Sequence, residues 1–186
     1  LAVTEGGGKA WCATRNAVFN YDPTSGELER LTKVNALSDV DISTVAFNGP
    51  LGVLVVGYRN GNMDLVSSGS ASNLSDIKRS NIVGDKAIYD IEFQGPIAYL
   101  ACGFGIVVVD LAQQEVRDTW YIAPGGTQQK VNAISFTADS IYAATNIGLF
   151  AAWRDAPNLA AFTSWNQRMD IPQPNGPFNG VGEIGG

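Results

Sequence analysis

Four side chains at matched places along the chain could bind a ligand. Asp64 and Asp110 occupy equivalent positions in two predicted hairpins, and Tyr58 and Phe104 lie at the mouths of the turns in those hairpins. Carboxylates can bind a cation or a sugar, and aromatic rings can stack on a sugar. These four residues are the candidate ligand-binding set. The alternative interpretation is that the carboxylates belong to ordinary turns and the rings pack between structural units.

The chain contains no histidine, which limits the chemistry open to it. Ser-His-Asp and Cys-His catalysis and every histidine-containing metal site are therefore excluded. Hydrolysis by two carboxylates and calcium binding through oxygen ligands remain open. The repeats described below align only single aspartates, and the pair Asp39 and Asp41 is a small part of the six to eight ligands that calcium takes. We expect no catalytic residue, no metal site and no cofactor.

Composition restricts the partners and the setting. The formal net charge of −6 argues against nucleic acid as a partner, because an acidic surface repels phosphates. Apolar runs such as Ile106–Val109 are far shorter than the roughly 20 residues that span a bilayer, and no signal-peptide pattern follows Leu1. Cys12 and Cys102 lie in apolar stretches, and we expect two small buried thiols that are not bonded to each other. The alternative is one disulfide.

A repeated hairpin organises the chain. The segment GYRNGNMDL places an Asn-Gly turn signal between two strand-like runs, which is typical of a β-hairpin. Similar hairpins align on Ala17, Gly61, Gly105 and Gly148, at intervals of 44, 44 and 43 residues. A spacing this regular indicates a structural unit that is copied along the chain.

Other markers keep the same spacing. The pattern aliphatic-x-x-aliphatic-x-Phe ends at Phe47, Phe93 and Phe136, which we expect to occupy equivalent positions between units. A strand rich in small residues follows, as in VLVVGY, AYLACG and IYAATN. After the hairpin, the candidates for a fourth strand are Leu28–Leu31, Ile77–Asn81, Arg117–Ile122 and Phe162–Trp165.

Four strands in about 44 residues is the size of a propeller blade, whose apolar faces are buried by neighbouring blades. We therefore predict an all-β fold, a partial β-propeller of about four four-stranded blades over residues 1–186, with an irregular Gly/Pro-rich tail at 166–186. The first unit lacks the Phe-bearing strand pattern. The chain thus begins and ends within the pattern, which favours an arc of a larger ring. An open arc exposes blade faces, so self-association is expected.

The residues also resemble a known family. Lys33–Asn48, KVNALSDVDISTVAFN, resembles the repeats of two-component-regulator-type propellers, with Ala36 in place of the usual glycine. The strings AYLACGFGIVVVDLAQQEVRDTWYI and IYAATNIGLFAA are similar to the first propeller of PorZ-type proteins of the type IX secretion system of Bacteroidetes. The resemblance covers about residues 9–165.

The resemblance implies a larger protein, with two propellers of about seven blades each and a C-terminal domain, of which this chain is about half of the first propeller. It implies export to the periplasm or the outer-membrane-associated cell surface. It also implies a role in attaching secreted cargo to anionic lipopolysaccharide, beside a sortase-like partner that does the chemistry. The implied partners are other cell-envelope secretion and attachment proteins, and polysaccharide or lipopolysaccharide.

Two hypotheses for function follow, with an enzyme as a third and less favoured one. The first is a non-catalytic binding and scaffold module of an exported cell-envelope assembly. The alternative is the extracellular ligand-sensing propeller of a hybrid two-component system that detects carbohydrates, which requires a transmembrane helix and a kinase elsewhere in the protein. A glycosidase or lyase needs two converging carboxylates, and the aligned repeats supply one aspartate each.

Overall fold

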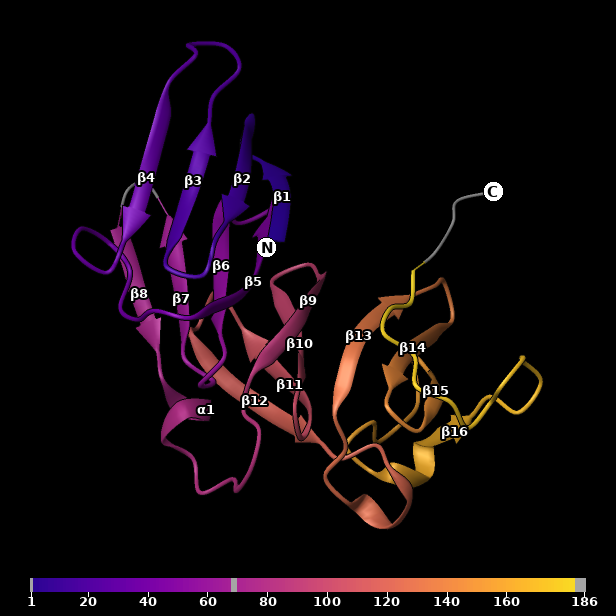
Figure 1. Cartoon of the computed structure of the whole chain (residues 1–186). Helices are drawn as coiled ribbons and strands as arrows, with labels where there is room; N and C mark the ends of the chain where they lie inside the picture. Colours follow the sequence, from indigo (N-terminus) through magenta and orange to yellow (C-terminus); the bar gives the residue numbers. More distant parts are fainter. Residues whose placement is uncertain (1, 68–69, 183–186) are drawn as a thin grey trace.

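The computed structural model describes residues 2–67 and 70–182. It contains four antiparallel sheets, and in each sheet the strands pair in chain order. We refer to these sheets as blades 1 to 4. Figure 1 shows them following one another from the N-terminal sheet in indigo to the C-terminal sheet in orange and yellow. The prediction of a propeller built from about four four-stranded blades is confirmed.

The strand bounds show how regular the unit is. The strands are β1 (Ala2–Gly6), β2 (Lys9–Ala13), β3 (Ala17–Tyr21) and β4 (Leu28–Thr32) in blade 1; β5 (Ile42–Asn48), β6 (Val53–Tyr58), β7 (Met63–Ser67) and β8 (Ser70–Leu74) in blade 2; β9 (Ile88–Gln94), β10 (Ile97–Cys102), β11 (Gly105–Asp110) and β12 (Glu115–Trp120) in blade 3; and β13 (Val131–Phe136), β14 (Ser140–Thr145), β15 (Gly148–Trp153) and β16 (Trp165–Gln167) in blade 4. Three short helices join them: α1 (Asp76–Arg79), η1 (Pro124–Gly126) and η2 (Phe162–Ser164).

The meander topology gives each blade two different ends. At one side of each blade lie the end of the second strand, the start of the third strand and the end of the fourth strand. The chain enters the next blade from this side. We call this side the linker end. It is formed by the turns 14–16, 59–62, 103–104 and 146–147 and by the linkers 33–41, 75–87 and 121–130. The first strands, β1, β5, β9 and β13, contact one another from blade to blade.

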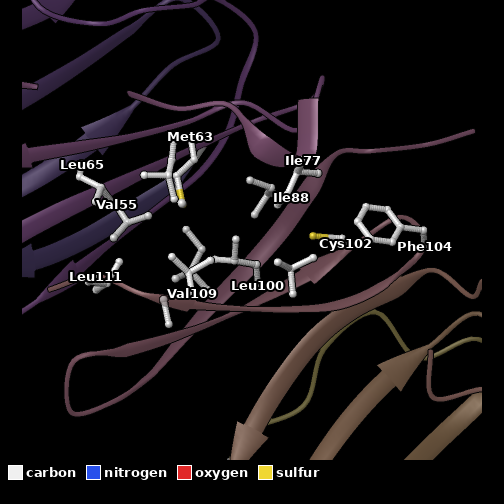
Figure 2. Packing of buried hydrophobic residues seen from close by; sticks show 14 residues of the cluster. Val55, Met63, Leu65, Ile77, Ile88, Leu100, Cys102, Phe104, Val109 and Leu111 are labelled. Carbon is white, nitrogen blue, oxygen red and sulfur yellow. The ribbon is translucent and has the colours of Figure 1, made fainter. Parts of the chain in front are cut away.

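Blades are held together by apolar side chains on both faces of their strands. Because side chains alternate along a strand, Leu54 and Val56 of β6 pack toward blade 1 whereas Val55 between them packs toward blade 3. Figure 2 shows the cluster between blades 2 and 3, where Met63 and Leu65 lie with Leu100 and Val109. Each blade thereby buries the apolar face of its neighbour, as the repeat predicts.

The three phenylalanines of the repeat occupy equivalent places, as predicted. Phe47 packs between blades 1 and 2, Phe93 between blades 2 and 3, and Phe136 between blades 3 and 4. Phe47 stacks on Trp11 with ring centroids 6.2 Å apart. The contact with blade 1 is so close that a Cβ on Gly6 would lie 1.9 Å from the Phe47 ring.

The sequence missed one strand and misplaced two. Blade 1 is complete, because Ala2–Gly6 forms its first strand without the phenylalanine of the pattern. In blade 2 the predicted fourth strand Ile77–Asn81 is wrong: its first residues belong to α1, and the strand is the polar segment Ser70–Leu74. In blade 4 the strand begins only at Trp165, after a 3-10 helix. These fourth strands lie at the blade edge, where one side faces solvent and the apolar signal is weak.

The two end blades differ in what covers their outer faces. On blade 1 the outer face exposes Val3, Tyr21 and Leu28, as expected for an open arc. On blade 4 the segment after β16 returns along the sheet, where the Phe178 amide donates to the Thr145 carbonyl and Asn132 Nδ2 donates to the Phe178 carbonyl. Residues 168–182 contain no helix or strand.

Candidate functional site

Two of the four predicted ligand-binding residues meet inside blade 2. Tyr58 ends β6 and Asp64 lies on β7, on either side of the turn 59–62, and both are fully buried. The phenol of Tyr58 donates a 2.5 Å hydrogen bond to Asp64 Oδ2. The turn itself forms as the Asn-Gly pair predicts, because Gly61 adopts the left-handed conformation at φ 80°.

Asp64 also fixes the linker from blade 1. The Ser38 backbone amide donates to Asp64 Oδ2 at 2.8 Å, the Ser38 hydroxyl donates to Oδ1, and Asn73 Nδ2 of β8 lies 2.9 Å from Oδ1. A buried carboxylate is stable when donors surround it in this way. Burial raises the pKa of Tyr58, and its hydrogen bond to Asp64 raises it further, so the phenol stays protonated. The network ties linker 33–41 to the centre of blade 2.

Asp39 is the centre of a second hydrogen-bond network, beside the network around Asp64. Its carboxylate accepts from Lys78 Nζ at 2.7 Å, from Asn60 Nδ2 at 2.8 Å and from Asn62 Nδ2 at 3.3 Å. Burial alone would raise the pKa of Asp39, but the hydrogen bonds from Lys78 and Asn60 outweigh it and hold the pKa well below its usual range. Asp39 therefore remains charged and joins linker 33–41, turn 59–62 and α1.

The other two candidates lie in blade 3. Phe104, in the turn 103–104, is buried in the cluster between blades 2 and 3, where Figure 2 shows it beside Cys102. Asp110 ends β11 and accepts from the Ala112 and Gln113 amides, which makes it the cap of the turn into β12. The structure therefore brings Tyr58 and Asp64 together and keeps Asp110 in a separate turn. Ligand binding by the four residues stays a prediction.

Sequence reasoning missed a half-buried pair of carboxylates on β9. Asp90 and Glu92 are two residues apart on the strand, so their side chains point to the same face, toward blade 4. There the Ile134 amide donates to Asp90 Oδ2 at 3.0 Å. Burial raises the pKa of Asp90. Burial and then the charge of Asp90 raise the pKa of Glu92 to about 7. The signal was visible as two acids at i and i+2 in the otherwise apolar strand IYDIEF.

The two cysteines are free, as predicted, but they differ in exposure. Cys102 is buried between blades 2 and 3, and burial raises the pKa of its thiol. Cys12 is exposed, so the prediction of two buried thiols is wrong for this residue. It lies on β2 with its side chain on the open outer face of blade 1, where no neighbouring blade covers it in this chain.

Most aromatic rings pack inside the molecule. Tyr99, Trp120 and Phe136 form a chain of rings with centroids 4.8 to 5.5 Å apart, and Trp165 extends it at 6.2 Å from Trp120. Trp153, Tyr21 and Phe162 are exposed, Trp153 the most, with 57% of its surface accessible. The four packed rings stabilise the interface between blades 3 and 4.

Of the four predicted ligand-binding residues, Phe104 lines one of two grooves near blades 3 and 4. One of about 350 Å³ lies between the linker after β12 and the outer strand of blade 4, lined by Phe162, Trp165, Asn166 and Gln167 among others. A small one of about 90 Å³ beside α1 is lined in part by Phe104. Among residues 2–67 and 70–182, no three His, Cys, Asp or Glu side chains gather in a way that could hold a metal ion. Within the same residues, no helix has the length and apolar character needed to cross a membrane.

Comparison with solved structures agrees with this architecture. PorZ, described as an essential bacterial surface component of the type IX secretion system of Porphyromonas gingivalis, superposes with a TM-score of 0.84 at 23% identity. The superposition covers 99% of this chain and 24% of PorZ, so the chain spans about a quarter of that protein. The extracellular domain of BT4673 from B. thetaiotaomicron, described as part of a hybrid two-component system, superposes at 0.65 with 11% identity over 88% of this chain and 23% of its own.

The sequence itself decides the family. No curated protein matches it. A family described as the N-terminal β-propeller domain of PorZ matches residues 11–166, which takes in most of the four blades. The chain belongs to the PorZ N-terminal β-propeller domain family.

Proposed function

We propose that this chain is a non-catalytic binding and scaffold module of an exported cell-envelope assembly, related in role to PorZ of type IX secretion. The observation that carries the proposal is the family match over residues 11–166. The structural likeness to PorZ, a surface component of that system, supports the same setting. In this role the module works at the periplasmic or outer surface of the outer membrane and helps to attach secreted cargo to lipopolysaccharide.

The internal chemistry supports a scaffold. The polar atoms of Tyr58 and Asp64 are hydrogen-bonded to each other, and Asp64 also accepts from Ser38. The carboxylate of Asp39 accepts hydrogen bonds from Lys78 and Asn60. These contacts fasten linkers to blades and favour a rigid body with loops presented at its ends. Asp90 and Glu92 face the neighbouring blade rather than a groove, which is a poor arrangement for hydrolysis because a substrate must reach both carboxylates.

A sensor propeller is the second candidate function. The likeness to the extracellular domain of a hybrid two-component system supports it. So does the groove beside β16, because aromatic rings and amide side chains are the groups that bind sugars, by stacking and by hydrogen bonds. In this case the module detects a carbohydrate outside the cell and the signal passes to a kinase of the same protein.

Chemical crosslinking in the native host distinguishes the two. The full-length protein that carries this domain is tagged, crosslinked on intact cells and purified from the membrane fraction, and its partners are identified by mass spectrometry. A scaffold is expected to recover secretion components and secreted cargo of the cell envelope, and the untagged strain is the control. Recovery of neither, together with a glycan-dependent change in transcription, contradicts the scaffold and supports the sensor.

A further inference from the structure

Positive charge gathers at the linker end of the blades. The turns and linkers that form this end hold seven of the twelve Lys and Arg residues of the chain and four acids. The seven are Arg15, Lys33, Arg59, Lys78, Arg79, Lys86 and Lys130. The described loops at the opposite end hold four acids, Asp22, Glu27, Asp139 and Asp155, and a single cation, Arg154. The module is therefore acidic overall with one basic end.

The resident acids hold these cations in place. Asp41 lies 2.5 Å from Arg15 Nε and 3.9 Å from Arg59 Nε, so it joins turn 14–16 of blade 1 to turn 59–62 of blade 2. Asp39 joins Lys33 and Lys78 at 3.6 and 2.7 Å. A guanidinium has five N–H donors, so Arg15 and Arg59 keep donors for a further acceptor after pairing with one carboxylate.

The arrangement continues around the arc toward blade 4. Lys130, just before β13, places Nζ 3.7 Å from the centre of the Tyr89 ring, and the Tyr89 phenol donates to Asp85 at 2.5 Å. Burial and then the hydrogen bond to Asp85 raise the pKa of Tyr89, and the positive charge of Arg59 opposes this rise. Arg15 and Arg59 share Asp41, and Lys130 lies over Tyr89 of β9. All three therefore lie at the linker end, in the turns of blades 1 and 2 and in the linker from blade 3 to blade 4.

Two exposed valines stand among these cations. Val34 follows Lys33 and is 97% exposed, and Val83 lies three residues before Lys86 and is 84% exposed. Aliphatic side chains of this kind suit a protein surface, where apolar and charged contacts alternate. A sugar would need a free aromatic face, but Lys130 covers one face of Tyr89 and Tyr58 is fully buried.

We propose that the linker end is a docking surface for an acidic segment of a protein partner. Arg15, Arg59 and Lys130 receive carboxylates of that segment, and Val34 and Val83 receive its aliphatic side chains. Arginine is suited to the first task because its planar fork matches a carboxylate at two points. The inference rests on the proposed scaffold function, to which it adds the face that is used and the chemistry of the partner.

Fluorescence anisotropy on the full-length protein tests it. The probe is a fluorescein-labelled peptide rich in glutamate and valine, compared with the same peptide carrying glutamine for glutamate and with dextran sulfate as an anionic polysaccharide. The test variant combines Arg15→Gln, Arg59→Gln and Lys130→Gln. The control combines Arg30→Gln, Arg117→Gln and Arg154→Gln, which removes the same charge elsewhere. A third variant combines Val34→Ser and Val83→Ser, and thermal unfolding checks the fold of each.

The test variant is expected to weaken binding of the acidic peptide at least tenfold, and the control variant less than twofold. The valine variant is expected to weaken it severalfold without affecting dextran sulfate, and raising salt from about 50 to about 300 mM weakens the remaining binding. Equal losses of peptide affinity in the test and control variants overturn the proposal. So does a result in which dextran sulfate binds more tightly than the peptide and the valine substitutions change neither affinity. If the peptide does not bind while crosslinking still recovers envelope partners, this inference fails and the scaffold function stands.

Discussion

The phenol of Tyr58 donates a 2.5 Å hydrogen bond to the carboxylate of Asp64, and neither side chain has exposed surface. From the sequence alone, both residues are candidates for ligand binding. Inside blade 2 their polar groups instead hold turn 59–62, strand β7 and the linker from blade 1 in one arrangement. This contact explains why a polar pair persists in a blade that is otherwise apolar.

Removing the phenol should therefore destabilise the blade. Tyr58→Phe leaves Asp64 with one donor fewer in a buried site, and we expect the free energy of unfolding to fall by about 1–3 kcal/mol. Urea unfolding followed by tryptophan fluorescence measures it. Tyr21→Phe, on the exposed outer face of blade 1, is the matched control and should change stability by less than about 0.5 kcal/mol. Equal effects of the two substitutions contradict a structural role for the contact.

Close packing between blades 1 and 2 should make Gly6 sensitive to a single methyl group. Gly6→Ala places a Cβ 1.9 Å from the ring of Phe47, so ring or strand must move, and we expect a loss of about 1–3 kcal/mol. Gly49→Ala is the control, because no atom lies within 4 Å of its Cβ position. Gly6→Ala should lower the unfolding free energy less in a Phe47→Leu background than in the parent protein, because the smaller side chain leaves room for the added methyl group. Independent, additive effects would argue against this contact.

Glu92 should make stability depend on pH. Its pKa is raised to about 7 in the folded protein, so folding favours the protonated form. Stability from this group is then greatest below its ordinary pKa of about 4.5 and is lost as the pH rises through 7. Glu92→Gln should match the parent protein near pH 4 and exceed its unfolding free energy by about 1–2 kcal/mol at pH 8, after allowance for the partial exposure of the side chain.

The control for this substitution is Glu115→Gln on the exposed edge strand of the same blade. Unfolding free energies at pH 4, 6 and 8 should show no comparable trend for it. A stability difference between Glu92→Gln and the parent protein that is constant across this range would show that the carboxylate is not held in an unfavourable charged state.

The thiols should react at very different rates. Cys12 is exposed on blade 1, whereas Cys102 is buried and has a raised pKa, so little thiolate forms. In the native protein a thiol reagent such as DTNB should label one cysteine rapidly, and Cys12→Ser should abolish that rapid phase. Both thiols should react after unfolding in urea. Rapid labelling of two thiols in the native state would mean that the interface between blades 2 and 3 opens readily.

The sequence supported the fold more fully than the site. The aligned hairpins predict β2–β3, β6–β7, β10–β11 and β14–β15 because central strands are apolar on both faces and keep a strong pattern. The edge strand Ser70–Leu74 carried no such pattern, and Ile77, whose side chain fills a cluster between blades, drew the prediction to the wrong segment.

The site depended on contacts between distant residues. Ser38 reaches Asp64 across 26 positions, and Arg15 reaches Asp41 across the same distance. Local patterns do not report such pairs, so buried carboxylates and surface carboxylates look alike in a sequence. Cys12 was misjudged for a related reason, since its strand is apolar but the face it occupies has no neighbour in this chain.

The proposed scaffold function is tested most directly by removing this propeller from its parent protein in the native host and measuring secreted cargo on the cell surface by biotinylation. The in-frame deletion should leave the remaining protein present in the membrane fraction while cargo is lost from the surface and found in the medium. Unchanged surface cargo in the deletion strain, with the rest of the protein intact, would contradict the account.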